Sequence, residues 1–265
     1  MNAFKPINEL ISLKGKVALI TGAAVGIGKA IAYRFAEAGV DLELVDINKS
    51  GLRAVKRELS QFKSEVNIHK VDVSQKDEIT ALWEELRGEE PDILVNNAGI
   101  YPFKNFLEVD SAFLQKVMDV NLTSAFWMCH QMIKSRLGRG GVIINVSSIE
   151  AILPFATDLV PYNISKIGVI ALTRALAKEY GKNGFRINVI IPGGIITPGT
   201  KAVAKQLSQF DMGILKSGIQ YKMRLPLGRG GQPDEVARMT LVLASDLSSY
   251  VHGALIAVDG GFLST

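Results

Sequence analysis

Short apolar runs alternate along the chain with longer stretches in which apolar positions recur every three or four residues. The short runs predict buried strands at 17–21, 40–47, 66–73, 92–99, 141–148, 186–194 and 253–261. The longer stretches predict helices at 26–39, 49–62, 75–87, 111–137, 161–180 and 233–245. Because strands alternate with helices and are apolar throughout, we expect a doubly wound α/β fold, with a parallel seven-stranded sheet covered on both faces.

This alternation occupies the whole chain, so we expect a single domain over 1–265. The least regular segment is 198–229, which mixes lysines with apolar residues. We expect it to form a lid over the substrate site.

Composition narrows the classes of function. The net charge is only +4, and the lysines and arginines are scattered, which argues against a nucleic-acid partner. The single cysteine, Cys129, suits a reducing compartment, and the three histidines lack metal-ligand spacing, so we expect no metal. No apolar run reaches signal-peptide or membrane-span length, which predicts a cytoplasmic protein without a membrane partner.

A glycine-rich turn follows the first predicted strand and opens the first helix. In TGAAVGIG, Gly22, Gly26 and Gly28 allow a pyrophosphate to approach the helix N-terminus, where free N–H groups favour negative charge. Asp46 ends the second strand, 18 residues after Gly28. Its carboxylate can accept hydrogen bonds from an adenosine ribose and would repel a 2′-phosphate, which favours NAD over NADP.

A second pattern places Tyr162 and Lys166 four residues apart at the start of a helix, and therefore on one face. TGAAVGIG stands at 21–28, NNAG at 96–99 and NVSS at 145–148. With these motifs, the chain resembles the short-chain dehydrogenase/reductase family over residues 12–262. The resemblance implies a Rossmann fold. The resemblance implies a catalytic set of four residues, Asn121, Ser148, Tyr162 and Lys166. It also implies, with the glycine turn, that the cofactor is bound by Gly22, Val25, Gly26, Ile27, Gly28, Asp46, Ile47, Asp72, Val73, Asn97, Ala98, Gly99, Tyr162, Lys166, Pro192, Gly193, Ile195 and Thr197.

The chemistry of these side chains suits proton transfer to or from a secondary alcohol. A free phenol has a pKa of about 10, and a neighbouring ammonium favours the phenolate, so we expect Lys166 and an oxidised nicotinamide to lower the pKa of Tyr162. Ser148 would hold the substrate oxygen, and Asn121 would anchor a water that connects Lys166 to solvent. The loop from Ser148 to Tyr162 is one residue longer than is usual in the family, and Ala151 stands where many members carry glycine. Ser147 therefore remains the alternative serine.

Substrate identity is less constrained. Tyr101, Glu150 and Phe155, with Phe103 and Asp158, follow predicted strands and can face the reacting carbon, unless the two carboxylates point to solvent. Carboxylates and aromatic rings suit a small polyhydroxy compound, such as a sugar or polyol. The alternatives are a 3-oxoacyl thioester on an acyl carrier, which the lysines of the lid favour, and a catalytically silent NAD-binding regulatory protein.

The predicted helix 111–137 is apolar on more than one side, which indicates that its outer surface is also buried. We therefore expect a homo-oligomer. The family resemblance implies a homotetramer.

Overall fold

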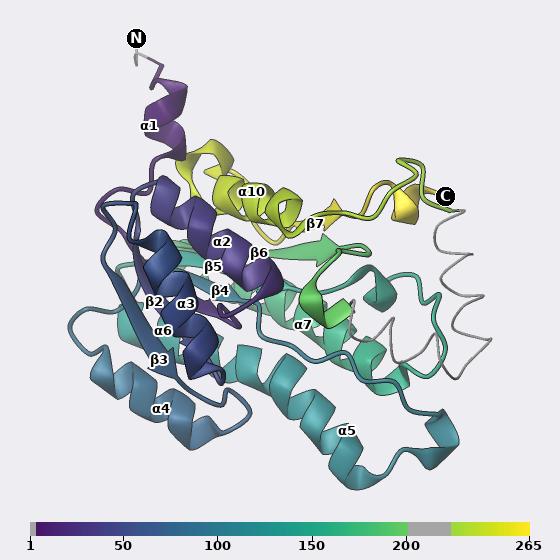
Figure 1. The fold of residues 1–265 in the computed structure, drawn as a ribbon. Coiled ribbons are helices and arrows are strands. Elements are labelled where there is room, and N and C mark those ends of the chain that lie inside the picture. The colour runs from purple at the N-terminus through teal and green to yellow at the C-terminus, as the bar shows by residue number, and fades with distance from the viewer. Residues whose placement is uncertain (1–3, 201–223) are drawn as a thin grey trace.

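A central parallel sheet organises the chain (Figure 1). The computed structural model describes residues 4–200 and 224–265. Within them, seven parallel strands follow the order β3-β2-β1-β4-β5-β6-β7. This confirms the predicted doubly wound α/β fold. The strands are β1 (Val17–Thr21), β2 (Asp41–Asp46), β3 (Val66–Lys70), β4 (Ile93–Asn96), β5 (Gly141–Val146), β6 (Phe185–Pro192) and β7 (Leu255–Val258).

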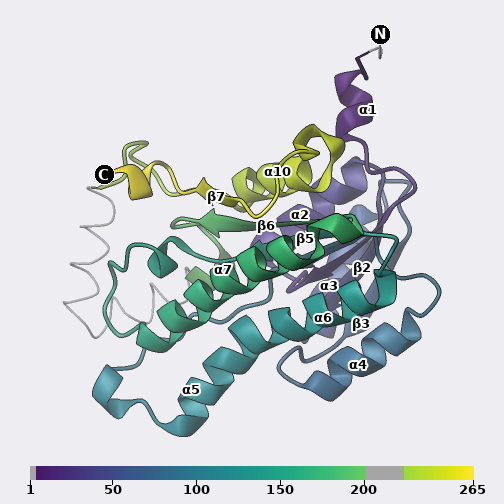
Figure 2. The ribbon, with the colours of Figure 1, turned by 180° about the vertical axis from the view of Figure 1, so that it is seen from behind.

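Helices cover both faces of the sheet (Figures 1 and 2). One layer contains α2 (Gly26–Glu37), α3 (Lys49–Leu59) and α10 (Pro233–Ala244). The other contains α4 (Lys76–Glu85), α5 (Ser111–Met118), α6 (Ser124–Arg136) and α7 (Val160–Tyr180). Each layer has its own apolar core, with Phe35 of α2 buried on one side and Met132 of α6 on the other. A short helix, α1 (Ile7–Ile11), was not predicted, because it buries no residue and so leaves no amphipathic pattern.

Several predicted elements differ from the structure at their ends or inside. The predicted strand 253–261 is reduced to β7, because Gly253, Gly260 and Gly261 adopt positive φ angles that an extended strand does not allow. The predicted helix 111–137 is interrupted between α5 and α6 by a π-helical turn, η2 (Asp119–Thr123). Such turns insert one extra residue per turn and often occur at functional sites, and this one contains Asn121.

The sheet order creates a crevice at its carboxyl edge. Strand β1 pairs with both β2 and β4, so the connections leave this point in opposite directions and the loops that follow diverge. In open α/β sheets, ligands bind at such a switch point. The loops after β1 to β6 carry most of the predicted site residues to this edge, and η2 and α7 carry the others, Asn121, Tyr162 and Lys166.

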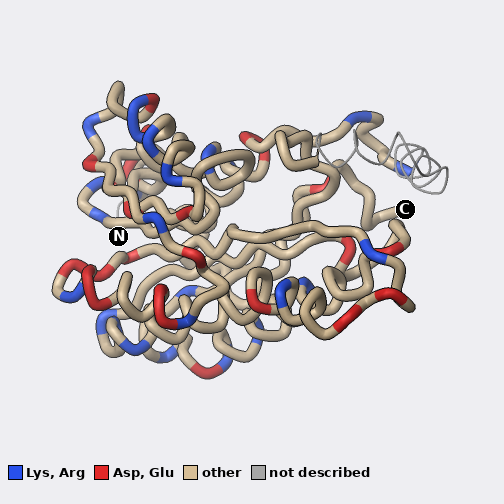
Figure 3. Tube along the Cα trace, turned by 60° about the horizontal axis from the view of Figure 1, so that its bottom comes forward, with Lys and Arg blue, Asp and Glu red and all other residues tan. Residues whose placement is uncertain are grey.

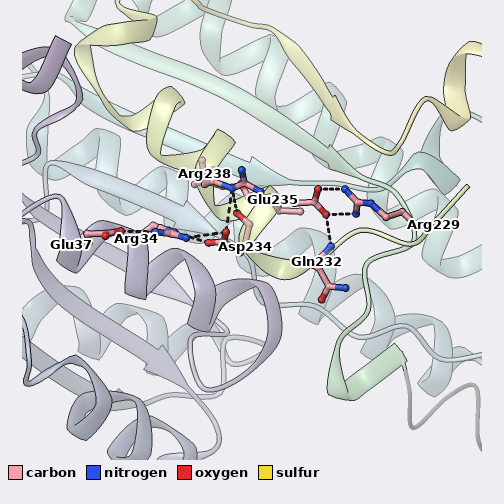
Figure 4. Close-up of polar contacts among 9 residues, drawn as sticks. Arg34, Glu37, Arg229, Gln232, Asp234, Glu235 and Arg238 are labelled. Carbon is pink, nitrogen blue, oxygen red and sulfur yellow. Dashed lines mark hydrogen bonds and ion pairs between the residues drawn. The ribbon is translucent and has the colours of Figure 1, made fainter. Parts of the chain in front are cut away.

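A network of charged side chains fastens α10 to the rest of the fold (Figure 4). Arg34 of α2 donates to Asp234 at the start of α10, and Arg229 donates through both terminal nitrogens to Glu235. The same Glu235 accepts from the Gln232 amide at 2.8 Å. Because Gly231 beside this network forms a bridge with Ile195, α10 is tied to the segment after β6 that lines the crevice.

Charge is mixed over the described part of the chain, where Lys and Arg alternate with Asp and Glu along the trace (Figure 3). None of the helices described in the structure is long and apolar enough to cross a membrane. Over residues 4–200 and 224–265, the structure likewise contains no cluster of three or more His, Cys, Asp or Glu side chains that could hold a metal ion.

Candidate active site

The glycine-rich turn is packed so tightly that side chains do not fit. A Cβ atom on Gly28 would lie 2.1 Å from the Gly22 carbonyl oxygen, and one on Gly22 would lie 2.9 Å from the Asn97 side chain. Asn97 donates to the carbonyls of Thr21 and Gly22 at 2.9 and 3.1 Å. The loop after β4 therefore holds the turn in place, and α2 begins at Gly26 directly after it, where the first N–H groups of the helix have no partner within the helix.

A cleft of about 570 Å³ runs beside this turn. The Asp46 carboxylate lies in its wall and accepts from the Ala24 amide at 3.0 Å and from the Asn48 amide at 2.9 Å. Val25 and Ile47 expose apolar surface at the cleft. Eleven of the predicted cofactor residues line this cleft: Gly22, Val25, Ile27, Asp46, Ile47, Asp72, Val73, Asn97, Ala98, Gly99 and Thr197.

These residues fit a nicotinamide dinucleotide. The glycine cradle would be filled by any Cβ, the Asp46 carboxylate keeps lone pairs for ribose hydroxyls, and the exposed aliphatic side chains provide walls for a flat base. The methyl group of Thr197 lies against the opposite side of the turn. A Cβ on Gly26 would lie 3.4 Å from this methyl group. Gly26 and Gly28 are not among the residues that line this cleft, and the close contacts of Gly28 indicate that it shapes the turn.

A second cavity of about 260 Å³ adjoins the cleft and shares Ile27, Asn97, Gly99 and Thr197 with it. Ser148 and Glu150 from the loop after β5 and Tyr162 and Lys166 from α7 meet in its wall. The other predicted cofactor residues, Pro192, Gly193 and Ile195, follow β6 and line the same cavity. The structure thus brings the phenol, the ammonium and the serine hydroxyl together in the wall of this second cavity.

Lys166 is buried, and its ammonium donates to the Val146 carbonyl at 3.0 Å. Burial lowers the pKa of Lys166 to about 8. Asn121 lies behind the cavity wall, where its side chain accepts from the Ile100 amide at 2.8 Å and donates to the Ile100 carbonyl at 3.0 Å. A Cβ on Gly99 would touch both groups, at 3.2 Å from Asn121 Oδ1 and 3.3 Å from Lys166 Nζ. The π-helical turn therefore places Asn121 next to the ammonium, across Gly99.

The electrostatics of Tyr162 correct one prediction. Burial raises the pKa of Tyr162 to about 12, a hydrogen bond with Ser148 opposes this rise, and the charge of Glu150 adds to it. The sequence predicted a lowered pKa from the neighbouring ammonium together with an oxidised nicotinamide. In the structure, Lys166 Nζ lies 5.9 Å from the centre of the phenol ring and is held by a backbone carbonyl, so desolvation outweighs its effect.

The two serines of NVSS have different surroundings. The Ser147 hydroxyl donates to the Lys166 carbonyl at 2.8 Å, which fixes it against α7. The Ser148 side chain is hydrogen-bonded to Tyr162 and also accepts from the Glu150 amide at 3.2 Å. Of the two, Ser148 is the serine in contact with the phenol.

The predicted substrate residues separate into two groups. Tyr101, Glu150 and Phe155 line the catalytic cavity, and the Tyr101 ring packs edge-on against Tyr162 with centroids 4.7 Å apart. Glu150 is only 2% exposed, so the alternative that it points to solvent is wrong. Phe103 and Asp158 do not line this cavity; Phe103 packs on Tyr101, and Asp158 occupies a left-handed turn with φ 63°.

Some residues of the site were not predicted from the sequence. The backbone groups of Ile100 and Val146 hold Asn121 and Lys166, and no sequence pattern reports a backbone contact. Thr200 lines the catalytic cavity and binds the Ile195 carbonyl through its hydroxyl. Asn163 contacts Glu150, and its place directly after Tyr162 was the one available signal.

Comparison with known proteins identifies the family to which the chain belongs. A family model described as enoyl-(acyl carrier protein) reductase matches residues 22–263. The chain belongs to the short-chain dehydrogenase/reductase family. It is therefore an oxidoreductase, as the motifs indicated.

Relatives of this dehydrogenase/reductase act on different substrates. It is 36% identical over 256 residues to 3-oxoacyl-(acyl-carrier-protein) reductase of Thermotoga maritima, covering 95% of the chain and 99% of the relative. Identity to galactitol 2-dehydrogenase (L-tagatose-forming) of Cereibacter sphaeroides is 35%, covering 94% and 96%. The structure of L-sorbose reductase from Gluconobacter frateurii, complexed with NADPH and L-sorbose, is similar with a TM-score of 0.89 at 32% identity, covering 97% and 99%.

Proposed function

We propose that this enzyme uses NAD to interconvert a secondary alcohol and its ketone on a small polyhydroxy compound of the sugar or polyol type. The observation that carries the proposal is the meeting of Ser148, Tyr162 and Lys166 in a compact cavity that also holds the Glu150 carboxyl. Carboxyl and hydroxyl groups in one wall provide acceptors and donors for a substrate with several hydroxyls. The described walls enclose only about 260 Å³, which suits a small molecule.

The side chains divide the work of the reaction. The dinucleotide, when bound, supplies the site that accepts or donates the hydride. Ser148 holds the substrate oxygen by a hydrogen bond, and Tyr162 takes the hydroxyl proton in oxidation or returns it in reduction. Lys166 supplies positive charge behind the phenol, and Asn121, which holds the Ile100 backbone, would anchor the water that connects Lys166 to solvent. The convergence of all four side chains argues against a catalytically silent protein.

The preference for NAD rests on Asp46. Its carboxylate is fixed by the Ala24 and Asn48 amides in the wall of the cleft. A 2′-phosphate placed there would meet this negative charge. The L-sorbose reductase has NADPH bound, so membership of the family does not by itself select NAD, and the choice has to be argued from this side chain.

A 3-oxoacyl thioester is the second candidate substrate, favoured by the resemblance to the acyl-carrier reductase of Thermotoga maritima. The lysines that supported it fall mainly in 201–223, outside the described residues, as does most of the predicted lid 198–229.

We also propose a homotetramer located in the cytoplasm. Leu114 and Phe126 on the α5–α6 side and Ile164 and Ile167 on α7 are exposed. Contacts between α5 and α7 bring these two helices together, so a second copy could cover both at once.

A substrate panel tests the proposed function. Sugars, polyols, simple secondary alcohols and a short 3-oxoacyl thioester are each supplied with NAD(H) or NADP(H), and absorbance of the reduced nicotinamide is followed. We expect the highest kcat/KM with a polyol or ketose and NAD(H). A higher kcat/KM for the thioester would support the second candidate, and turnover of neither class, with the dinucleotide bound, would refute both.

A further inference from the structure

Glu150 is a buried carboxyl group in the wall of the catalytic cavity. It lies in the short helix η3 (Ile149–Ala151), and its two oxygens accept from the Phe155 and Ala156 amides at 3.3 Å each. The Asn163 side chain provides a further hydrogen bond. Burial raises the pKa of Glu150 to about 7, because these neutral donors only partly replace water.

Other charged groups of this region leave the carboxyl without a counter-ion. Lys166 on α7 donates to a backbone carbonyl, and Asp158 on the same loop lies outside the cavity wall. Arg224 and Asp259, on the C-terminal side, contact an aromatic ring and backbone amides respectively. Over residues 4–200 and 224–265, no cation forms an ion pair with Glu150.

Glu150 is connected to the catalytic pair in two ways. Its backbone N–H donates to the Ser148 hydroxyl oxygen at 3.2 Å, and Ser148 is in turn hydrogen-bonded to the Tyr162 phenol. Both side chains line the same cavity, so the negative charge of Glu150 opposes loss of the Tyr162 proton. The first contact orients the serine, and the second affects where the proton of the pair resides.

We propose that Glu150 is a positioning residue that keeps the proton on Tyr162 while its own carboxyl is ionised, and so adapts the site to carbonyl reduction. This inference rests on the proposed function. In reduction, the carbonyl carbon accepts hydride from the reduced dinucleotide while the oxygen takes the Tyr162 proton, leaving a phenolate that regains a proton from solvent. Protonation of Glu150 removes the opposing charge, makes the phenolate easier to form and favours alcohol oxidation.

The variant Glu150→Gln tests this proposal because it removes the charge and nearly keeps the shape. In the unmodified enzyme, kcat/KM for oxidation rises with pH and that for reduction falls, both with the ionisation of Tyr162. The rising part of the oxidation profile and the falling part of the reduction profile are called the two limbs. We expect Glu150→Gln to move both limbs to lower pH by about one pH unit. On the limbs, oxidation would become up to about tenfold faster and reduction up to about tenfold slower. Below pH about 7, where Glu150 is itself protonated, the two enzymes should converge.

Asp158→Asn is the matched control, because it removes a carboxylate from the same loop without touching the cavity wall, and asparagine tolerates the left-handed backbone there. Its limbs should stay in place. Affinity for NADH, followed by fluorescence, should change less than about twofold in Asp158→Asn, since Asp158 lines neither the dinucleotide cleft nor the catalytic cavity. Binding of NADH by Glu150→Gln shows that its cleft is intact, because Glu150 does not line that cleft. A loss of both reaction directions in Glu150→Gln with unmoved limbs would overturn the proposal, as would an equal shift in the control.

Asn163→Ala provides a second route if Glu150→Gln does not fold. It removes a donor to the carboxylate, so Glu150 should remain protonated to higher pH, and just above pH about 7 the variant should have a higher kcat/KM for oxidation than the unmodified enzyme. Equal kcat/KM for oxidation in this pH range would contradict the proposal. If the unmodified enzyme turns over no alcohol or ketone, the proposed function fails; if it does and the limbs stay fixed, only the role of Glu150 fails.

Discussion

Cofactor choice should depend on the charge of Asp46, and the structure suggests the variant with which to test it. Both carboxylate oxygens accept backbone hydrogen bonds, from Ala24 at 3.0 Å and Asn48 at 2.9 Å. Asp46→Ala would leave both N–H groups without this acceptor, at a cost of about 1–3 kcal/mol in stability for each group that finds no water. Asp46→Asn keeps one acceptor oxygen and removes the charge, so it separates electrostatics from folding.

The expected magnitude follows from Coulomb's law. Two unit charges about 4 Å apart at an effective dielectric constant of about 20 interact by about 4 kcal/mol. The carboxylate faces an open cleft, so we take about a quarter of this value, or about 1 kcal/mol, which corresponds to a factor of about five in kcat/KM. Asp46→Asn should therefore reduce discrimination against NADP about fivefold, and it should also weaken use of NAD, because the ribose loses a charge-assisted hydrogen bond.

Steady-state kcat/KM with NAD and NADP is the assay, for the unmodified enzyme, Asp46→Asn and Asp46→Ala. Ile47→Arg adds a cation beside the same position and should move the preference further toward NADP. Asp41→Asn is the matched control, because Asp41 lies at the other end of β2 and also accepts a backbone amide, that of Glu65 at 2.8 Å. Equal or better efficiency with NADP in the unmodified enzyme would refute the reasoning, and would indicate that Lys49 holds the phosphate.

Three further predictions concern catalysis, assembly and stability. Tyr162→Phe should lower kcat by about 10²–10⁴-fold with NAD affinity nearly unchanged, and retention of more than about a tenth of kcat would exclude Tyr162 as the proton-transfer group. The protein should have the mass of a tetramer by light scattering at micromolar concentration, because Leu114 and Phe126 are exposed, and a monomer mass would end this proposal. The hydrogen bond that His69 donates to the Glu43 carboxylate raises the pKa of His69 above 6.5, so His69→Gln should lose stability to urea in mildly acid solution. This loss should fade as pH rises through the folded-state pKa of His69, because the unmodified protein then loses the same ion pair; a difference independent of pH would contradict it.

Residues close in sequence carried most of what could be predicted. Strand and helix periodicity depends on burial of one face, so it located the seven strands to within a few residues of their ends. The alternation of strands and helices then predicted the doubly wound class. The glycine turn was equally readable, because the clash of any Cβ with the Gly22 carbonyl and Asn97 restricts the residue type locally. Tyr162 and Lys166 were brought to one face by helical spacing alone.

Tertiary structure decided the features that depend on which distant segments meet. The π-helical turn at Asn121 leaves no periodic signal, yet it sets the contact with Ile100. Glu150 is held in the cavity wall by hydrogen bonds from the Phe155 and Ala156 amides. The sequence does not show these contacts, so it could not decide whether the Glu150 side chain points into the cavity or to solvent.

The proton affinity of Tyr162 shows the same division. The sequence placed the Lys166 ammonium four residues from Tyr162 and therefore predicted a lowered pKa for the phenol. It shows which charged groups are near but not how far each is exposed to solvent. Only the packed structure reveals that the phenol is desolvated and faces the Glu150 carboxylate, which together raise the pKa, while Lys166 donates to the Val146 carbonyl. Sequence determined which groups are present at this site, and the tertiary structure determined how much water and how much charge surrounds each of them.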